Sequence, residues 1–320
     1  MSDRHPHGPI FVVGAARSGT TLLQYMLGSH PNISAPTGES QFIIPLQRDA
    51  SKFGGLTELA NIERVLLEMQ RISPEFIDTD LHGMRFDAPS LARDCVKHGA
   101  DSITKIISHV YETNARGEGK QRWLDKTPYY ILNLDTILSM FPDAQIIHLI
   151  RDGRDNVLSM LARKHDLRLF NVHHAAKTWQ QYVEAGQSFG RHLTANQYHE
   201  IRYEDLVSDP TKHMADICEF LGEVFDPAVV EFKKSRDSGA KTPMLKQSIQ
   251  GGNTDKWRTQ MTPRSIRVVE GAVGETLERN GYQISTSTVR LPLLVRAGYR
   301  VHEYISRWIS RNLGDIFAFR

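Results

Sequence analysis

The segment GAARSGTT at residues 14–21 has the glycine spacing of a phosphate-binding loop but lacks the lysine that such loops use. The loop of nucleoside triphosphatases reads Gly, four residues, Gly, Lys and then Ser or Thr, and its lysine reaches the β- and γ-phosphates. Gly14 and Gly19 keep this spacing, whereas Thr20 occupies the lysine position. The first backbone N–H groups of the following helix can still bind an anion, because they have no intrahelical partner. The segment therefore predicts a phosphate site without the usual triphosphate chemistry. Its further donors are Arg17, Ser18 and Thr21.

A second basic segment, IIHLIRDGRDNVLSMLARK at residues 146–164, leaves an apolar strand and enters a helix. Arg151 stands at the carboxyl end of that strand. Ser159 and Arg163 lie four residues apart, so that both would reach one anion from the same helix face. We favour anion binding, because Arg151 ends a strand that is predicted to adjoin the phosphate loop. The alternative is a solvated surface on which Arg151, Arg154 and Arg163 pair with Asp152, Asp155 or Asp166.

Alternating strands and amphipathic helices predict an α/β fold whose parallel sheet positions these segments. Ligands of such sheets bind beyond the carboxyl ends of the strands, where the loops after Ala15, Thr127 and Arg151 would converge. Residues 235–262, rich in Lys, Gly, Ser, Thr and Gln, predict a long mobile loop, and loops of that length are often lids or binding loops. The expected strands cover residues 9–15, 122–127, 144–151 and 197–206. The expected helices cover residues 20–29, 56–72, 102–114, 131–140, 154–164, 173–190, 211–221 and 262–280.

Composition favours one large domain, expected over residues 8–285, followed by an extension at 286–320. The formal net charge of +2 is too small for a general nucleic-acid binder, so a basic site must be local. Cys95 and Cys218 lie far apart without metal-ligand spacing, which favours a reducing compartment and no metal site. The N-terminus lacks the apolar core of a signal peptide, and no apolar stretch approaches the roughly 20 residues that span a bilayer. We therefore expect a cytoplasmic protein.

Two segments together, GAARSGTTLL and LIRDGRDNVLSM, resemble the phosphosulfate and 3′-phosphate motifs of sulfotransferases that use 3′-phosphoadenosine 5′-phosphosulfate (PAPS). The resemblance is closer to tyrosylprotein sulfotransferases and their bacterial relatives than to the small-molecule enzymes of animal cytosol. It implies a central parallel sheet of the P-loop type, flanked by helices. It extends to GESQFIIP at 38–45, LDKTPYY at 124–130, IRYEDLV at 201–207 and DKWR at 255–258.

This resemblance also implies how the donor is held. PAPS would be the donor, 3′,5′-adenosine bisphosphate the product, and no metal ion would be needed. Arg17 would contact the 5′-phosphosulfate and the acceptor region, while Ser18, Gly19, Thr20 and Thr21 cradle the phosphate. The 3′-phosphate would lie against Arg151, Ser159 and Arg163. Further donor contacts by resemblance are Tyr203, Lys256 and Trp257.

The acceptor hydroxyl needs a base, because its proton must leave in the transition state. Glu39 matches the glutamate of the Gly-Glu-Glu-Thr segment of the tyrosylprotein enzymes, although Thr37 replaces the first glutamate and the spacing is one residue longer. Alternatively, Glu39 caps a helix over residues 42–46. Lys126 matches the lysine that bridges the leaving phosphosulfate; it could instead pair with Asp125, but adjacent strand residues point to opposite faces. The alternative bases are His30, His109 and His148, but the position of each favours a structural role.

Apolar residues recur at helical spacing in the last 35 residues, with arginines on an adjacent face. We expect an amphipathic helix packed on the domain. Interfacial membrane attachment or homodimerisation is the alternative, supported by six basic against two acidic residues after Ser285. The apolar residues are Leu294, Ala297, Val301, Tyr304, Ile305 and Trp308, and the arginines are Arg296, Arg300, Arg307 and Arg311.

The resemblance implies an enzyme that transfers a sulfuryl group in line from PAPS to a hydroxyl acceptor, with Glu39 as general base. The acceptor is a small molecule, glycan, lipid or peptide that the sequence does not specify. One alternative is an ATP-dependent P-loop phosphotransferase, which the missing lysine opposes. Another is a non-catalytic nucleotide-binding protein, which is disfavoured by the joint presence of Arg17, Glu39, Lys126, Arg151 and Ser159.

Overall fold

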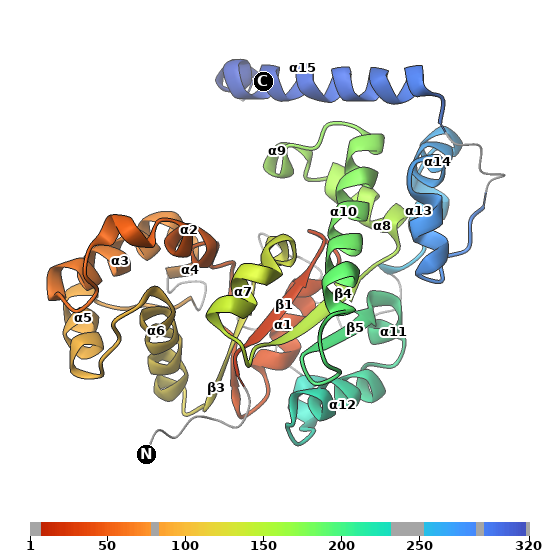
Figure 1. The fold of residues 1–320 in the computed structure, drawn as a ribbon. Coiled ribbons are helices and arrows are strands. Elements are labelled where there is room, and N and C mark those ends of the chain that lie inside the picture. Colours follow the sequence, from red (N-terminus) through yellow and green to blue (C-terminus); the bar gives the residue numbers. More distant parts are fainter. Residues whose placement is uncertain (1–7, 78–82, 232–252, 286–290, 318–320) are drawn as a thin grey trace.

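Five parallel strands form the central sheet of the molecule, in the order β2-β3-β1-β4-β5 (Figure 1). The structure is a computed structural model that describes residues 8–77, 83–231, 253–285 and 291–317. Most of the predicted 235–262 loop thus lies outside the described residues. The strands are β1 (Ile10–Gly14), β2 (Ile33–Ser34), β3 (Arg122–Lys126), β4 (Gln145–Ile150) and β5 (Tyr198–Arg202).

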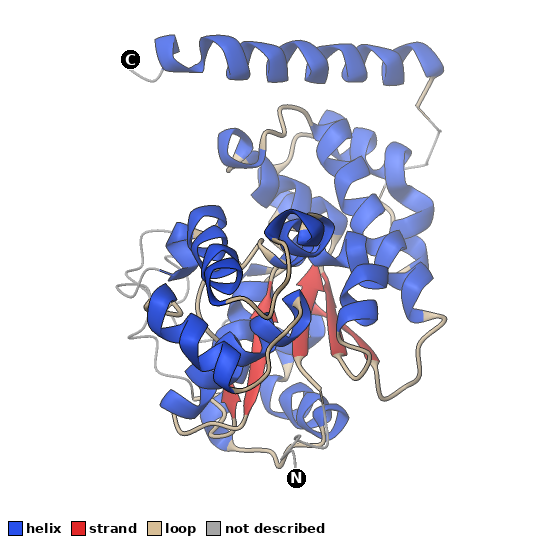
Figure 2. Ribbon diagram, turned by 60° about the vertical axis from the view of Figure 1, so that its left-hand side comes forward, coloured by secondary structure: helices blue, strands red, loops and turns tan. Residues whose placement is uncertain are grey.

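Helices cover both faces of this sheet, as the near-continuous apolar strands require (Figure 2). In β1, Phe11 and Val13 belong to the core on one face, and Ile10 and Val12 to the core on the other. The first face carries α2 (Ile43–Arg48), α3 (Leu59–Ile72), α4 (Pro74–Ile77), α5 (Ala88–Lys97), α6 (Ile103–Gly117) and α7 (Leu134–Met140). The second carries α1 (Thr20–Gly28), α11 (Tyr203–Ser208) and α12 (Pro210–Leu221).

A third core lies beside the carboxyl end of the sheet. It forms between α8 (Gly153–Leu161), α10 (Val172–Gly190), α13 (Trp257–Gln260) and α14 (Pro263–Arg279), and the short α9 (Lys164–Leu167) follows α8. At its centre, the buried indole of Trp179 donates from Nε1 to the carbonyl oxygen of Arg151 at 3.0 Å. This hydrogen bond holds the end of β4 against α10.

The predicted α/β fold is confirmed, with two local corrections. The strand predicted over 197–206 ends at Arg202, because Tyr203 begins α11. The helix predicted over 154–164 ends at Leu161, so Ser159 and Arg163 do not share one helix. Beyond the end of α8, Arg163 adopts a non-helical conformation with φ −118° and ψ 33°.

The loop between β1 and α1 follows a path that depends on its glycines. Gly19 has φ 106°, and a Cβ atom there would lie 2.4 Å from Cδ2 of Tyr203. Arg17 in the same loop has φ 72°, which is unfavourable for a residue with a side chain. The packing of Tyr203 against Gly19 thus joins the phosphate loop to the start of α11.

We predict that Gly19→Ala destabilises the fold by about 1–3 kcal/mol more than Gly99→Ala, because only the first substitution creates a collision. Gly99 also has a positive φ, of 68°, but a Cβ atom there meets nothing within 4 Å. The measurement is urea unfolding of both variants. Equal destabilisation would mean that Tyr203 does not constrain the loop.

The last helix, α15 (Leu293–Phe317), confirms the expected helix but not its orientation. It lies across the end of α10 (Figure 1) and contacts the domain through polar residues, among them Glu303, which is 3% exposed. The apolar residues that were expected to pack on the domain are exposed instead, for example Leu294 at 86%. Among the described residues, no helix has the length and apolar character that crossing a membrane requires.

Candidate functional site

Arg151 lies at the carboxyl end of β4 and reaches the phosphate loop. Its Nη1 donates to the carbonyl oxygen of Arg17 at 3.2 Å, and its Nη2 donates to the carbonyl oxygen of Asn253 at 2.6 Å. The side chain is 5% exposed, and no carboxylate of the described residues lies within ion-pair distance of it. The surface pairing considered for Arg151 is therefore wrong. A buried guanidinium held by neutral carbonyl groups is a site that an anion would complete.

Tyr203 connects Arg151 to the same loop. The guanidinium carbon of Arg151 lies 4.8 Å from the centroid of the Tyr203 ring, within the range of a cation–π interaction. The Tyr203 hydroxyl accepts a hydrogen bond from Asn253 Nδ2 at 3.1 Å. Since the ring also packs against Gly19, Tyr203 contacts both halves of the predicted donor site.

Arg17 places a second positive charge in this region. Its Nε donates to Ser159 Oγ at 3.3 Å, which brings together residues 142 positions apart. The pKa of Arg17 is lowered, first by burial and then by the charges of Arg163 and Arg151. Positive groups therefore converge on this loop more closely than the surrounding carboxylates compensate. A bound anion would relieve this repulsion.

Two buried donors around the phosphate loop have no hydrogen-bond partner among the described residues. They are Ser18 Oγ, on a side chain with no exposed surface, and Arg151 Nε. Buried polar groups are normally satisfied, so unsatisfied donors beside a cluster of positive charge indicate a place for acceptor atoms. Thr20 and Thr21 begin α1 directly after Gly19, and their N–H groups belong to the free N-terminal turn of that helix.

Glu39 and Lys126 form an ion pair beside the phosphate loop. Lys126 Nζ lies 3.1 Å from Glu39 Oε1, although the residues are 87 positions apart. The lysine side chain is 4% exposed and the glutamate side chain 37%, so the carboxylate is open to solvent and to an incoming molecule. Asp125 points to the opposite face, where it accepts a hydrogen bond from Tyr111 at 2.5 Å. The alternative pairing of Lys126 with Asp125 is therefore wrong.

The loop around Glu39 is held firmly. Ser40 N donates to Thr127 Oγ1 at 3.0 Å, and Ser40 Oγ lies 2.7 Å from Tyr130 Oη, so the loop is anchored to the segment after β3. Gln41 has φ 52°, a strained value for this residue type. The α2 helix begins at Ile43 with Phe42 as N-cap and no side-chain cap. The capping alternative for Glu39 is therefore wrong.

The other expected donor contacts, Arg163, Lys256 and Trp257, have different surroundings. The exposed Arg163 binds Asp166 at 2.5 Å, so the surface pairing considered for it is present. Lys256 precedes α13, and Trp257 is buried between two guanidinium groups, at 3.8 Å from Arg154 and 4.4 Å from Arg258. Nucleotide contacts by Lys256 and Trp257 stay predictions.

The three histidines considered as bases have partners elsewhere. His30 Nε2 bonds the carbonyl oxygen of Val224 at 2.9 Å, and its Nδ1 accepts from Asn32 N. His109 Nε2 lies 2.8 Å from Asp94 Oδ2, in the lobe of α5 and α6. His148 is fully buried in β4. These environments are structural, as expected from their positions in the sequence.

Comparison with known proteins decides the family. The sequence model of the sulfotransferase family matches residues 9–227, which is more than half of the chain. The chain belongs to the sulfotransferase family. The match includes the phosphate loop, Glu39, Lys126, Arg151 and Tyr203, and it ends before residues 255–258.

Relatives of this sulfotransferase include animal and bacterial proteins. Protein-tyrosine sulfotransferase 1 of Danio rerio is 24% identical over 303 residues, covering 92% of this chain and 72% of that protein. An uncharacterized protein of Aquifex aeolicus (strain VF5) is 27% identical over 269 residues, covering 78% of this chain and 30% of that protein. The sulfotransferase domain of the Synechococcus PCC 7002 olefin synthase has a similar structure, with a TM-score of 0.57 and 26% identity, covering 88% of this chain and 98% of the domain. These similarities identify the chain as an enzyme of the sulfotransferase type.

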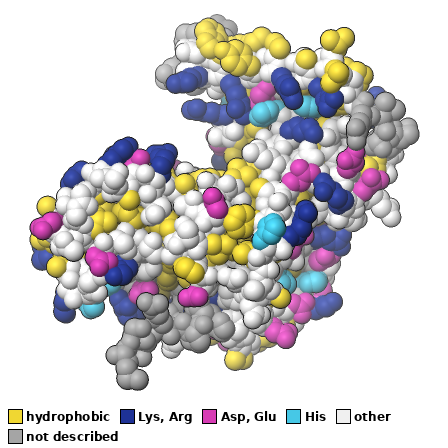
Figure 3. Space-filling view, viewed as in Figure 1, with side chains coloured by type: hydrophobic (Ala, Val, Ile, Leu, Met, Phe, Trp, Pro, Cys, Tyr) yellow, Lys and Arg dark blue, Asp and Glu magenta, His cyan; other side chains and the backbone are white. Residues whose placement is uncertain are grey.

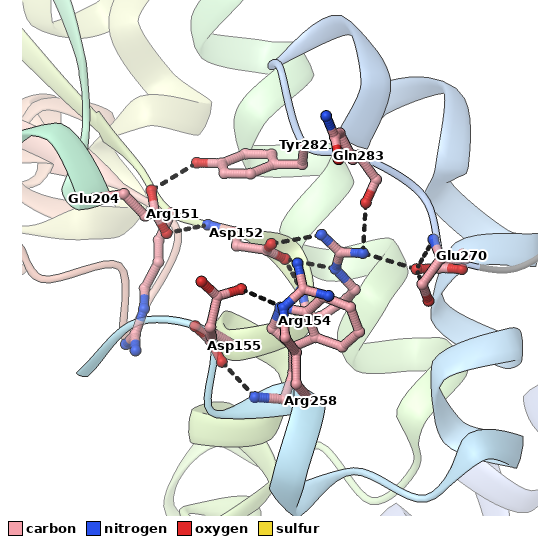
Figure 4. A network of polar contacts seen from close by, with 12 residues as sticks. Arg151, Asp152, Arg154, Asp155, Glu204, Arg258, Glu270, Tyr282 and Gln283 are labelled. Carbon is pink, nitrogen blue, oxygen red and sulfur yellow. Dashed lines mark hydrogen bonds and ion pairs between the residues drawn. The ribbon is translucent and has the colours of Figure 1, made fainter. Parts of the chain in front are cut away.

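A network of polar contacts in this sulfotransferase is centred on Arg154 (Figure 4). It was not predicted from the sequence. The Arg154 side chain is 2% exposed and binds Asp152 at 2.7 Å and Glu270 at 2.7 Å. It also donates to the carbonyl oxygen of Gln283 at 2.8 Å. The network ties the turn after β4 to α14 and to the end of the domain. The surface pairing considered for Arg154 is correct in its partner Asp152 but wrong in its location, which is buried.

Two further contacts extend the network toward Arg151. Glu204 Oε1 accepts from Asp152 N, and Glu204 Oε2 accepts from Tyr282 Oη, both at 2.9 Å (Figure 4). Burial raises the pKa of the Glu204 carboxyl. Asp155 Oδ1 accepts from Trp257 N at 2.8 Å, and burial raises the pKa of the Asp155 carboxyl as well. Carboxylates thus fix the backbone at Asp152, directly after Arg151, and at Trp257.

We predict that Arg154→Met destabilises this enzyme by about 3–5 kcal/mol, because Asp152 and Glu270 would lose their buried ion pairs with the guanidinium. The matched control is Arg163→Met, which removes an exposed ion pair and should cost less than about 1 kcal/mol. Urea unfolding of both variants measures the difference. Similar losses for the two would show that burial does not distinguish these arginines.

Proposed function

We propose that this sulfotransferase transfers a sulfuryl group from PAPS to a hydroxyl group of an acceptor and releases 3′,5′-adenosine bisphosphate. The observation that carries the proposal is Arg151, a buried guanidinium that touches the phosphate loop and pairs with no carboxylate of the described residues. One anion site in the loop and a second at Arg151 suit a donor with phosphate groups at both ends. A terminal 3′-phosphate is the feature that distinguishes PAPS from ATP.

The 5′-phosphosulfate would lie on the N-terminal turn of α1, against Ser18, Thr20 and Thr21. Arg17 would contact its charged oxygens from inside the loop. The 3′-phosphate would lie against Arg151 and Ser159, whose Oγ is joined to Arg17. Further donor contacts in this proposal are Gly19, Arg163, Tyr203, Lys256 and Trp257.

Arg163 would join the 3′-phosphate by exchanging Asp166 for the phosphate. Its pair with Asp166 is exposed and therefore contributes little stability. After burial, the charge of Arg163 is the next cause of the lowered pKa of Arg17. A phosphate carries more negative charge than one carboxylate and accepts a bidentate guanidinium, which favours the exchange.

Glu39 would accept the proton of the acceptor hydroxyl as its oxygen attacks sulfur. The bond between sulfur and the bridging oxygen breaks in line, and its electron pair stays on the departing phosphate. Lys126 and Arg17 would stabilise that charge. The ion pair between Glu39 and Lys126 suits this sequence, because it places a carboxylate and an ammonium group side by side next to the reacting atoms. No step requires a metal ion.

A reducing compartment suits the chain, and we propose a cytoplasmic location. Cys95 and Cys218 are free and buried. Burial raises the pKa of Cys95 to about 12 and that of Cys218 to about 11, so both stay protonated thiols near neutral pH. The acceptor is any hydroxyl compound that reaches the exposed carboxylate of Glu39.

We predict that Glu39→Gln and Arg151→Ala separate turnover from donor binding. Glu39→Gln should lower kcat about 10²–10⁴-fold with little change in bisphosphate affinity, because the amide cannot accept the proton. Arg151→Ala should weaken bisphosphate binding about 10–100-fold, since charged hydrogen bonds are lost. The measurements are titration calorimetry with the bisphosphate and radiolabelled sulfuryl transfer to phenol, sugar, lipid and peptide acceptors. Equal loss of bisphosphate affinity in both variants would assign Glu39 a structural role.

We further predict that the wild-type enzyme binds 3′,5′-adenosine bisphosphate far more tightly than ATP with magnesium. The physical reason is that Arg151 has no phosphate to bind when the 3′ position carries a hydroxyl group. Calorimetric titration with both nucleotides measures this preference, and adenosine 5′-phosphate is the matched control for the 3′-phosphate. Tighter binding of ATP with magnesium would favour a phosphotransferase. Bisphosphate binding without transfer to any acceptor would favour a non-catalytic nucleotide-binding protein.

A further inference from the structure

Large apolar side chains form an exposed stripe along α15. Leu294 is 86% exposed, Tyr304 73%, Val301 58% and Trp308 54%. In the space-filling view, hydrophobic side chains gather along the outer edge of this helix (Figure 3). Isolated apolar residues are common on protein surfaces, but a continuous stripe on one helix face indicates an interaction site. The stripe also includes Leu293, Ile305 and Ile309.

The opposite face of α15 already holds the helix on the domain. The Glu303 carboxylate is buried and accepts from Phe170 N at 3.1 Å and Asn171 Nδ2 at 2.8 Å. The Tyr299 ring stacks on His173, with 5.4 Å between centroids. Because these polar contacts fix the rotation of the helix, the apolar stripe is turned away from the domain. The domain therefore cannot cover the stripe while these contacts hold.

The exposed Arg300 and Arg311 occupy one flank of the stripe, whereas Arg307 binds Glu303 at 3.2 Å and Arg296 is half-buried. Arg296, Arg300, Arg307 and Arg311 recur at helical spacing, and basic side chains gather along α15 in the space-filling view (Figure 3). Glu303 is the sole carboxylate in residues 293–312, and it is turned into the domain. The surface that α15 presents to solvent is therefore both apolar and positive.

We propose that α15 binds the surface of an anionic lipid bilayer and lies in the plane of that surface. The apolar stripe would enter the boundary between headgroups and acyl chains, where Trp308 and Tyr304 are favoured, and the exposed Arg300 and Arg311 would meet lipid phosphates. This inference is independent of the donor site.

Charge distinguishes a bilayer from a second copy of the chain as the occupant. An antiparallel pair of α15 helices packed through their stripes would bring the two arginine rows to the same edge. Residues 293–312 offer no exposed carboxylate to neutralise those rows. An anionic bilayer supplies the missing negative charge along the whole helix.

Tryptophan fluorescence tests the proposal without a label. Three of the four tryptophans, Trp123, Trp179 and Trp257, are at most 5% exposed, so a change caused by surface binding reports Trp308. The full chain is mixed with vesicles of phosphatidylcholine alone, or of phosphatidylcholine and phosphatidylglycerol in equal amounts. We expect a blue shift, protection from acrylamide quenching and co-sedimentation with the anionic vesicles.

Two paired substitutions separate the apolar and electrostatic parts. Val301→Glu with Ile305→Glu should reduce vesicle binding at least about tenfold, because two carboxylates would enter the apolar boundary. Val224→Glu is the matched control, since Val224 is 86% exposed outside α15. Arg300→Gln with Arg311→Gln should lower anionic-vesicle binding about tenfold or more, as each arginine contributes about fivefold near an anionic surface. Thermal unfolding without lipid verifies that each variant folds.

Three outcomes would overturn the proposal. The first is no binding of the wild-type chain to anionic vesicles. The second is unchanged binding by the Val301→Glu, Ile305→Glu variant, which would place the contact outside α15. The third is a lipid-independent blue shift that grows with protein concentration together with a doubled mass in light scattering, which would make a second copy the occupant.

Discussion

The candidate site depends on one buried positive charge, that of Arg151, which no carboxylate of the described residues pairs. Arg151 is buried at the end of β4, where its Nη atoms donate to two backbone carbonyl groups and its guanidinium lies over an aromatic ring. Arg17 is close enough for the two charges to repel, which contributes to the lowered pKa of Arg17. Such an arrangement costs stability unless an anion completes it. The surrounding fold therefore has to hold both arginines in place against their mutual repulsion.

The three arginines that follow β4 have different roles because they have different partners. Arg154 is buried between Asp152 and Glu270 and acts as a structural link to α14. Arg163 is exposed and has a replaceable partner. Arg151 alone of the three has neutral partners. The same division appears in Glu39 and Lys126, whose ion pair has one buried and one open side chain. The exposed carboxylate of Glu39 is accessible for chemistry, whereas the buried side chain of Lys126 keeps the site rigid.

The parts of the candidate site that depend on local sequence patterns were predicted from the sequence. The glycine spacing located the phosphate loop, the apolar runs located β1 and β4, and strand alternation placed Lys126 and Asp125 on opposite faces. Long-range partners were not predictable, because the contacts of Glu39 with Lys126 and of Arg154 with Glu270 join residues 87 and 116 positions apart. The end of α8 at Leu161 and the outward apolar face of α15 were missed as well. A helical pattern shows that two faces differ, but tertiary contacts decide which face is buried.

The most direct test of the central claim is a crystal structure of the enzyme with 3′,5′-adenosine bisphosphate. The account predicts the 3′-phosphate within hydrogen-bond distance of Arg151 and Ser159. It places the 5′-phosphate on the backbone N–H groups at the start of α1. Unsatisfied Ser18 Oγ and Arg151 Nε would gain acceptors. A bisphosphate bound elsewhere, or one whose 3′-phosphate points to solvent while Arg151 keeps only its carbonyl partners, would contradict the account.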